Sequence, residues 1–84
     1  MRVLKFPLAI ADIQQVTMPA GASILHVGVQ KGYPCLWALC DNTQLVSHIV
    51  YVCGTGHPVP DSAVYVGTFM VQDGDLVFHV FAEP

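Results

Sequence analysis

The segment with the most distinctive chemistry is Gly54-Thr55-Gly56-His57-Pro58-Val59-Pro60, which combines a hydroxyl and an imidazole with glycines and prolines. Glycine lets a backbone approach a ligand closely, and proline stiffens the chain that follows. Such a loop can present N–H groups, the Thr55 hydroxyl and the His57 ring to a phosphate or a carboxylate. It is not a P-loop, because the lysine and the following helix are missing. A rigid crossover between two sheets is the simpler interpretation, and a binding role is the alternative.

A second candidate is the pair His26 and Trp37. If Lys31-Gly32 forms a tight turn between the strands Ser23 to Gln30 and Tyr33 to Asp41, His26 faces Trp37, Gly28 faces Cys35 and Ile24 faces Leu39. An aromatic plane beside a histidine can stack a base or another flat ring and hydrogen-bond its edge. A core tryptophan with a histidine neighbour, or an oligomer contact, is the commoner explanation of such a pair.

The remaining reactive residues form no catalytic or metal-binding pattern. The four histidines, His26, His48, His57 and His79, have no HxH or HxxxH spacing. A nucleophile, base and orienting group cannot be read from the sequence, so we expect no enzyme, no cofactor and no metal site. The cysteines lack a CxxC pair and lie in apolar strand patterns, so we expect buried, reduced thiols at Cys35, Cys40 and Cys53.

The clearest structural element is the C-terminal hairpin. Two runs rich in β-branched and aromatic residues, Tyr65 to Gln72 and Leu76 to Phe81, are joined through Asp73-Gly74, a strong hairpin signal. A two-residue turn predicts the pairs Met70–Val77, Thr68–His79 and Val66–Phe81, with Thr68 and His79 as a polar couple. The opposite face of the hairpin is predicted to be core. The face that should meet water is largely apolar, and we expect it to be an oligomer interface formed by Val66, Thr68, Met70, Val77, His79 and Phe81.

Short strand patterns separated by turn signals continue through the whole chain. Runs at Arg2 to Leu8, Ile13 to Met18 and Leu45 to Cys53 complete a set of seven, and no stretch has a sustained helical period. Pro7 indicates that the first strand is an edge strand. We therefore predict one domain, residues 1–84, with an all-β fold. It is a small antiparallel sandwich or barrel of about six to seven short strands with a C-terminal β-hairpin and no long helix.

The composition restricts the partners. Hydrophobic residues make up 54% of the 84 residues and charged residues only 11%, against roughly 25% in typical domains. A small chain has much surface to cover, so we expect a homo-oligomer or a tight binding protein. Three basic residues, Arg2, Lys5 and Lys31, cannot form a DNA or RNA groove, although a small anionic ligand remains possible. No apolar run is long enough to span a membrane, and the N-terminus lacks a signal-peptide pattern.

Several segments together resemble a family of small, uncharacterised proteins of bacteriophages and prophages. The resemblance covers nearly the whole chain and rests on ILHVGVQ at 24–30, CLWAL at 35–39, GTGHPVP at 54–60, YVGTF at 65–69 and LVFHVF at 76–81. It implies a small, mostly β protein that acts in the cytoplasm of an infected bacterial host. It supplies no activity and no site residues.

As a class, small accessory phage proteins without catalytic motifs commonly act by binding other molecules. We therefore expect a non-enzymatic binding protein, active in counter-defence or host modulation, that captures a small nucleotide-like ligand in a homo-oligomer. The expected ligand site comprises His26, Trp37, Gly54, Thr55, Gly56 and His57. Alternatives are an inhibitor that occludes a host or defence protein through an apolar sheet face, and a minor virion or assembly component.

Overall fold

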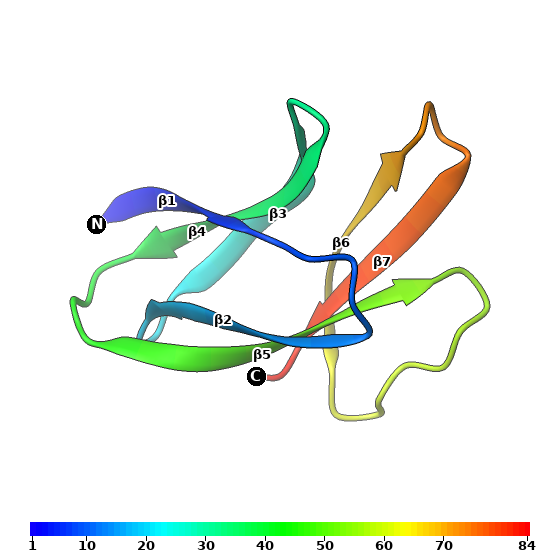
Figure 1. Cartoon of the computed structure of the whole chain (residues 1–84). Coiled ribbons are helices and arrows are strands. Elements are labelled where there is room, and N and C mark those ends of the chain that lie inside the picture. Colours follow the sequence, from blue (N-terminus) through cyan, green and yellow to red (C-terminus); the bar gives the residue numbers. More distant parts are fainter.

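The computed structural model describes residues 1–84 as seven strands in two antiparallel sheets, with no helix (Figure 1). The strands are β1 (Arg2–Pro7), β2 (Ile13–Pro19), β3 (Ser23–Gln30), β4 (Tyr33–Cys40), β5 (Leu45–Gly54), β6 (Val64–Val71) and β7 (Leu76–Ala82). The predicted all-β sandwich class is confirmed. None of the chain is a helix that could cross a membrane.

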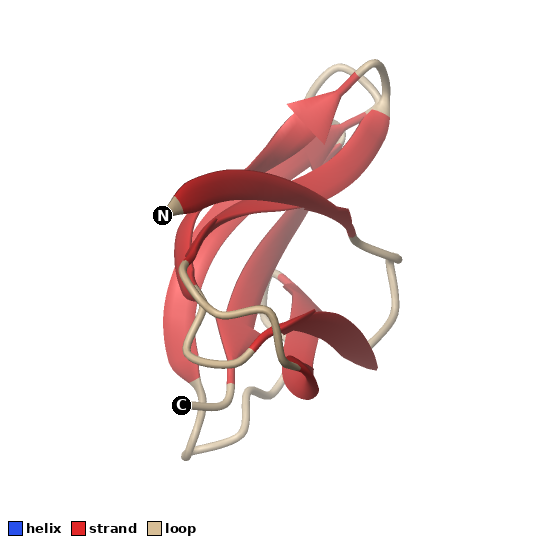
Figure 2. Cartoon of the chain, turned by 90° about the vertical axis from the view of Figure 1, so that its left-hand side faces the viewer, coloured by secondary structure: helices blue, strands red, loops and turns tan.

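The strand order separates the chain into a three-stranded sheet, β1-β4-β3, and a four-stranded sheet, β2-β5-β7-β6. Strand β1 is an edge strand, as Pro7 predicts, because proline has no N–H to donate to a further neighbour. The view in Figure 2 shows strands joined by loops alone. The two sheets come together where β3 packs beside β6, and Gly67 allows this approach. A Cβ added to Gly67 would lie 3.0 Å from the Cβ of Val27.

The core lies between the sheets and is entirely apolar. Alternate residues of each strand point inward, as the period of two in a strand requires. Met18, Leu36, Val50 and Val80 are fully buried, and the chain has no buried polar or charged residue. The opposite faces of both sheets therefore carry nearly all the residues able to do chemistry.

The C-terminal hairpin keeps most of its predicted register. Met70 pairs with Val77 and Thr68 with His79, as predicted, although the connection is a four-residue loop, Gln72 to Asp75, between the last paired residues. The predicted pair Val66–Phe81 is wrong. A β-bulge inserts one extra residue at Val66, so Tyr65 pairs with Phe81 instead. Val66 consequently packs against the core rather than on the outer face.

The β3–β4 hairpin shows the same behaviour. The pairs His26–Trp37 and Gly28–Cys35 are confirmed. The predicted pair Ile24–Leu39 is wrong, because a second irregularity between Ile24 and His26 shifts Ile24 opposite Ala38. In both hairpins the register counted from the turn holds until the first bulge.

Candidate functional site

Three side chains form a row across the outer face of the three-stranded sheet. Lys5 of β1 pairs with Trp37 of β4, and Trp37 pairs with His26 of β3. Directly paired residues share a face, so the Lys5, Trp37 and His26 side chains project from the same side of the sheet. The two ring centroids are 5.8 Å apart with an interplanar angle of 36°. Gly28 leaves room for them, since an added Cβ would be 3.2 Å from His26 Nε2 and 3.6 Å from Trp37 Cζ3.

A cavity of about 350 Å³ adjoins this row at the turn between β3 and β4. Lys31 and Gly32 both have positive φ, 52° and 83°, and form the predicted tight turn. Lys5 Nζ donates a hydrogen bond of 2.7 Å to Gln30 Oε1 across the cavity wall. The lining residues are Lys5, Pro7, Gln30, Lys31, Tyr33, Pro34 and Cys35.

The charge at this cavity is opposite to that of the whole chain. The formal net charge is −3, yet two of the three basic residues, Lys5 and Lys31, line the cavity and no acidic residue does. Tyr33 adds an exposed aromatic ring. Two ammonium groups and an aromatic ring that line one cavity suit a small, flat anion. Lys5 is not among the predicted site residues, because the β1–β4 pairing that places it beside Trp37 is not a local feature. Lys31 and Tyr33 are not among them either, although both belong to the predicted β3–β4 hairpin.

The Gly54–Pro60 loop lies on the other sheet, at the end of β5. His57 N donates a 3.0 Å hydrogen bond to Gly54 O, and Gly56 within this turn has a φ of 89°. The His57 ring covers Gly54, whose added Cβ would lie 3.2 Å from the ring. Thr55 Oγ1 forms a 2.7 Å hydrogen bond with His79 Nε2 of β7, which holds the loop against the sheet.

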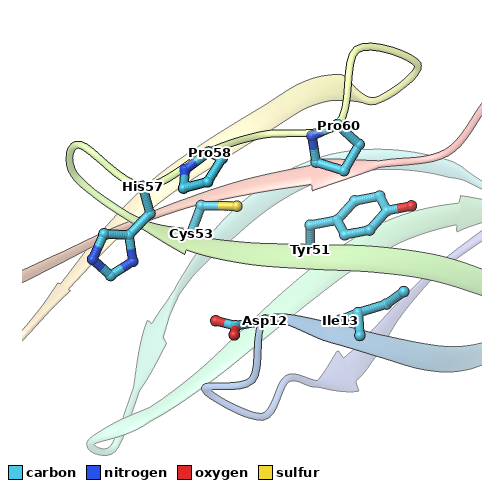
Figure 3. A pocket seen from close by; sticks show the side chains of 7 residues that line it. All are labelled: Asp12, Ile13, Tyr51, Cys53, His57, Pro58 and Pro60. Carbon is cyan, nitrogen blue, oxygen red and sulfur yellow. The ribbon is translucent and has the colours of Figure 1, made fainter.

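Beneath this loop is a cleft of about 260 Å³, shown in Figure 3. The rings of Pro58 and Pro60 lie on one side of Cys53 and Tyr51, and the start of β2 lies on the other. Burial, together with the negative charge of Asp12, raises the pKa of the Cys53 thiol. The thiol is therefore protonated at neutral pH and unsuited to nucleophilic attack. The cleft is lined by Asp12, Ile13, Tyr51, Cys53, His57, Pro58 and Pro60.

The predicted ligand residues thus fall into two groups on different sheets. His26 and Trp37 belong to the three-stranded sheet, whereas Gly54 to His57 follow the four-stranded one. No cavity of the chain is lined by members of both groups. Neither His26 nor Trp37 lines a cavity, and the basic cavity meets their row only through Lys5. Of the second group, His57 lines the cleft.

The outer face of the four-stranded sheet carries a row of large side chains across all four strands. Ile13 pairs with Tyr51, Tyr51 with Phe81, and Phe81 with Tyr65. The Tyr65 and Phe81 rings meet edge to face with centroids 5.5 Å apart. Ile13 and Tyr65 are 60% and 56% exposed. We call this set the aromatic row after its three rings. Its members are Tyr51, Phe81 and Tyr65, with the aliphatic Ile13 at one end.

A hydrogen-bonded polar chain lies beside the aromatic row. Tyr65 OH and Thr68 Oγ1 are 2.8 Å apart, and Thr68 Oγ1 lies 3.0 Å from His79 Nδ1, whose other nitrogen is bonded to Thr55. The predicted couple of Thr68 and His79 is confirmed as part of this chain. Of the predicted interface residues, Met70 is 57% exposed and Val77, His79 and Phe81 are half-buried on this face, while Val66 is not on it.

At the edge of the same face, Glu83 Oε1 accepts hydrogen bonds from Tyr51 at 2.8 Å and from Ser62 at 2.6 Å. The hydrogen bond to Glu83 is the largest cause that raises the pKa of Tyr51. Burial and the negative charge of Glu83 raise this pKa further. All three cysteines are free and buried. No group of three or more His, Cys, Asp or Glu side chains is arranged to hold a metal ion.

The family model described as "Domain of unknown function (DUF7352)" matches residues 1–84, so the chain belongs to that family. No curated protein and no solved structure matches the chain.

Proposed function

We propose that this DUF7352 member is a non-enzymatic binding protein that captures a small nucleotide-like ligand and works as a homo-oligomer. Its proposed setting is the cytoplasm of an infected bacterium, where a phage-encoded protein of this kind acts in counter-defence or host modulation. The observation that carries the ligand proposal is the row Lys5–Trp37–His26 beside a basic cavity on an otherwise acidic chain.

Each part of such a ligand has a counterpart among these residues. A base can stack on the Trp37 or Tyr33 ring and accept or donate a hydrogen bond at the His26 imidazole. A phosphate can bridge the ammonium groups of Lys5 and Lys31, which line one cavity. Two lysines balance about one phosphate group, so the proposed ligand carries few charges.

The test is ligand binding by the parent and three charge variants. A panel of nucleoside monophosphates, cyclic nucleotides and cyclic dinucleotides is screened for a rise in melting temperature, which any ligand specific for the folded state must cause. For the best ligand, we expect Lys5→Gln and Lys31→Gln each to weaken binding by about tenfold, the effect of losing one charge-assisted hydrogen bond. Arg2→Gln removes the same charge on β1 outside the cavity and should leave the affinity unchanged. A panel that moves no melting curve contradicts the proposal, as does an equal loss in all three variants.

The second group of residues is tested by His57→Ala. If the ligand is held by one chain, this variant binds like the parent, because His57 lines the cleft and not the basic cavity. A loss of affinity in the oligomer but not in a monomeric variant places His57 of one subunit beside the basic cavity of another.

A second candidate function is occlusion of a host or defence protein, and the aromatic row is the observation that favours it. Exposed or half-buried aromatic side chains on a face with few charges are typical of the centres of protein interfaces, and Tyr65 is exposed while Tyr51 and Phe81 are half-buried. The two functions are separated by two variants. Met70→Lys beside that row should abolish capture of a protein partner, whereas Lys5→Gln should weaken nucleotide binding and leave capture of the protein partner unchanged.

A further inference from the structure

The largest cavity of the chain is separate from both sites above. It has a volume of about 570 Å³ and opens between the sheets, at the end where β3, β5 and β6 begin and β7 ends. Its apolar wall is formed by Ala22, Ile24, Val46, Val64, Val66 and Ala82. No lysine or arginine lines it, so a phosphate has no counterpart here.

One polar side chain of this cavity occupies a position that is otherwise aliphatic. On β5, the inward-facing residues are Val46, His48, Val50 and Val52, and Val50 and Val52 belong to the core. His48 pairs with Val16, whose side chain is buried in the same core. The imidazole of His48 therefore enters the space between the sheets from the inner face of β5 and lines the cavity.

The hydrogen bond of this ring defines what it offers to a ligand. His48 Nε2 lies 3.3 Å from the carbonyl oxygen of Pro19. A carbonyl only accepts, so Nε2 carries the proton and Nδ1 of the neutral ring is left as an acceptor. Nδ1 has no hydrogen-bond partner in the chain and is not fully buried, so this acceptor is free for a ligand.

We propose that this cavity binds a small, largely apolar molecule that carries one hydrogen-bond donor, received by Nδ1 of His48. The volume falls in the range of ligand pockets, and apolar walls with a few placed polar groups are typical of such pockets. Ser47 and Glu83 also line the cavity, but Glu83 Oε1 already accepts hydrogen bonds from Tyr51 and Ser62, and Ser47 is exposed. The mouth of a small β-sandwich or barrel is a common location for them. The ligand class differs from that of the basic cavity, so the two proposals stand independently.

Indole and benzofuran form a matched pair of probes, because they have nearly the same shape and only indole has an N–H donor. Each is titrated into isotope-labelled protein and followed by NMR. We expect shifts at Ile24, Val46 and Ala82, and an affinity about fivefold higher for indole, the factor given by one net hydrogen bond. In His48→Leu the affinities should become equal.

Ala82→Leu narrows the cavity and should weaken both probes, which keeps the test decisive if His48→Leu fails to fold. Equal affinities in the parent, no binding of either probe, or shifts centred away from the cavity overturn the proposal. Indole binding that vanishes as the protein concentration rises assigns the cavity to a second copy of the chain and also overturns it. A nucleotide that binds the basic cavity should not compete with indole.

Discussion

At the scale of single residues, the chain keeps polar groups in the apolar outer face of the four-stranded sheet by bonding them to one another. Tyr65, Thr68, His79 and Thr55 form a continuous chain of hydrogen bonds across β6, β7 and the loop after β5. Partly desolvated polar groups that lack hydrogen-bond partners destabilise the fold. Each hydrogen bond of this chain supplies such a partner and removes that cost. Because of this arrangement, a partner could cover the face without leaving a buried polar group that lacks a hydrogen bond.

Replacement of Thr68 by valine tests the polar chain, because valine keeps the shape and removes the hydroxyl. We expect the free energy of unfolding to fall by about 1–2 kcal/mol, since His79 Nδ1 and Tyr65 OH both lose a partner. Urea unfolding measures the change. The control is Thr17→Val on β2, whose exposed hydroxyl bonds no side chain. Equal effects of the two exchanges would mean that the polar chain does not stabilise the fold.

Tyr51 gives a prediction about alkaline pH. Its hydrogen bond to Glu83, followed by burial and the Glu83 charge, raises its pKa above the ordinary value of 10.0. The protonated phenol is thus favoured in the folded state. Its contribution to stability is complete below pH 10.0 and is lost as the pH rises through the raised pKa.

The measurement is the pH dependence of unfolding in the parent and in Tyr51→Phe, together with the absorbance of tyrosinate. We expect the parent to lose stability relative to Tyr51→Phe as the pH rises through this range. Glu83→Gln should let Tyr51 ionise at a lower pH, because the largest cause of the shift is removed. Parallel stability curves for the parent and Tyr51→Phe would contradict the assignment.

At the scale of strands, the contact between β3 and β6 depends on the absence of a side chain at Gly67. A Cβ there would lie 3.0 Å from Val27 Cβ, and Val27 is branched and buried. We expect Gly67→Ala to cost about 1–3 kcal/mol by overpacking. In Val27→Ala/Gly67→Ala the clash is removed, so the double variant should be more stable than the sum of the two single effects predicts. The changes in the free energy of unfolding are measured with denaturant. If the two single changes add up to that of the double variant, contact between Gly67 and Val27 does not set the distance between β3 and β6.

The sequence predicts the strands well and their register only locally. Seven strands and the tight turn at Lys31-Gly32 follow from alternation and turn residues, because these signals act over a few residues. The second predicted turn, Asp73-Gly74, is the centre of a four-residue connection. The pairs Thr68–His79 and His26–Trp37 are found by counting from a turn. The pairs beyond the bulges cannot be found by counting from a turn. A bulge depends on tertiary packing and has no local signal in this chain.

The same distinction applies to the candidate sites. Trp37 and His26 lie in one hairpin, and their pairing could be predicted. Lys5 joins them through β1–β4, strands separated by two others in the sequence, and only the folded structure shows that Lys5 and Lys31 line one cavity. His48 is visible in the sequence as a polar residue on a face of valines, which is the one signal for the cavity between the sheets.

At the scale of the whole molecule, both sheets expose apolar side chains, but the basic residues belong to one of them. Ile13, Tyr65 and Met70 are exposed on the four-stranded sheet. The three-stranded sheet exposes Val3, Leu25 and Tyr33 and also carries Lys5 beside Trp37. Association through the four-stranded sheet would cover its apolar face and leave the basic cavity on the other sheet open. A two-fold axis through the aromatic row would bring the same residues of two copies together, the commonest symmetry of homo-oligomers.

Met70→Lys tests this assembly, because Met70 is 57% exposed and is not part of the core. We expect light scattering of the parent to give a multiple of the 9.1 kDa chain mass, and the variant to give the mass of one chain. A buried lysine without a partner would be too costly at the interface, while the isolated variant chain loses little stability. Val3→Lys on β1, where Val3 is 55% exposed, places the same charge on the other sheet and should leave the oligomer intact. A parent that is monomeric at micromolar concentration, or an oligomer that dissociates equally in both variants, would exclude the four-stranded sheet as the interface.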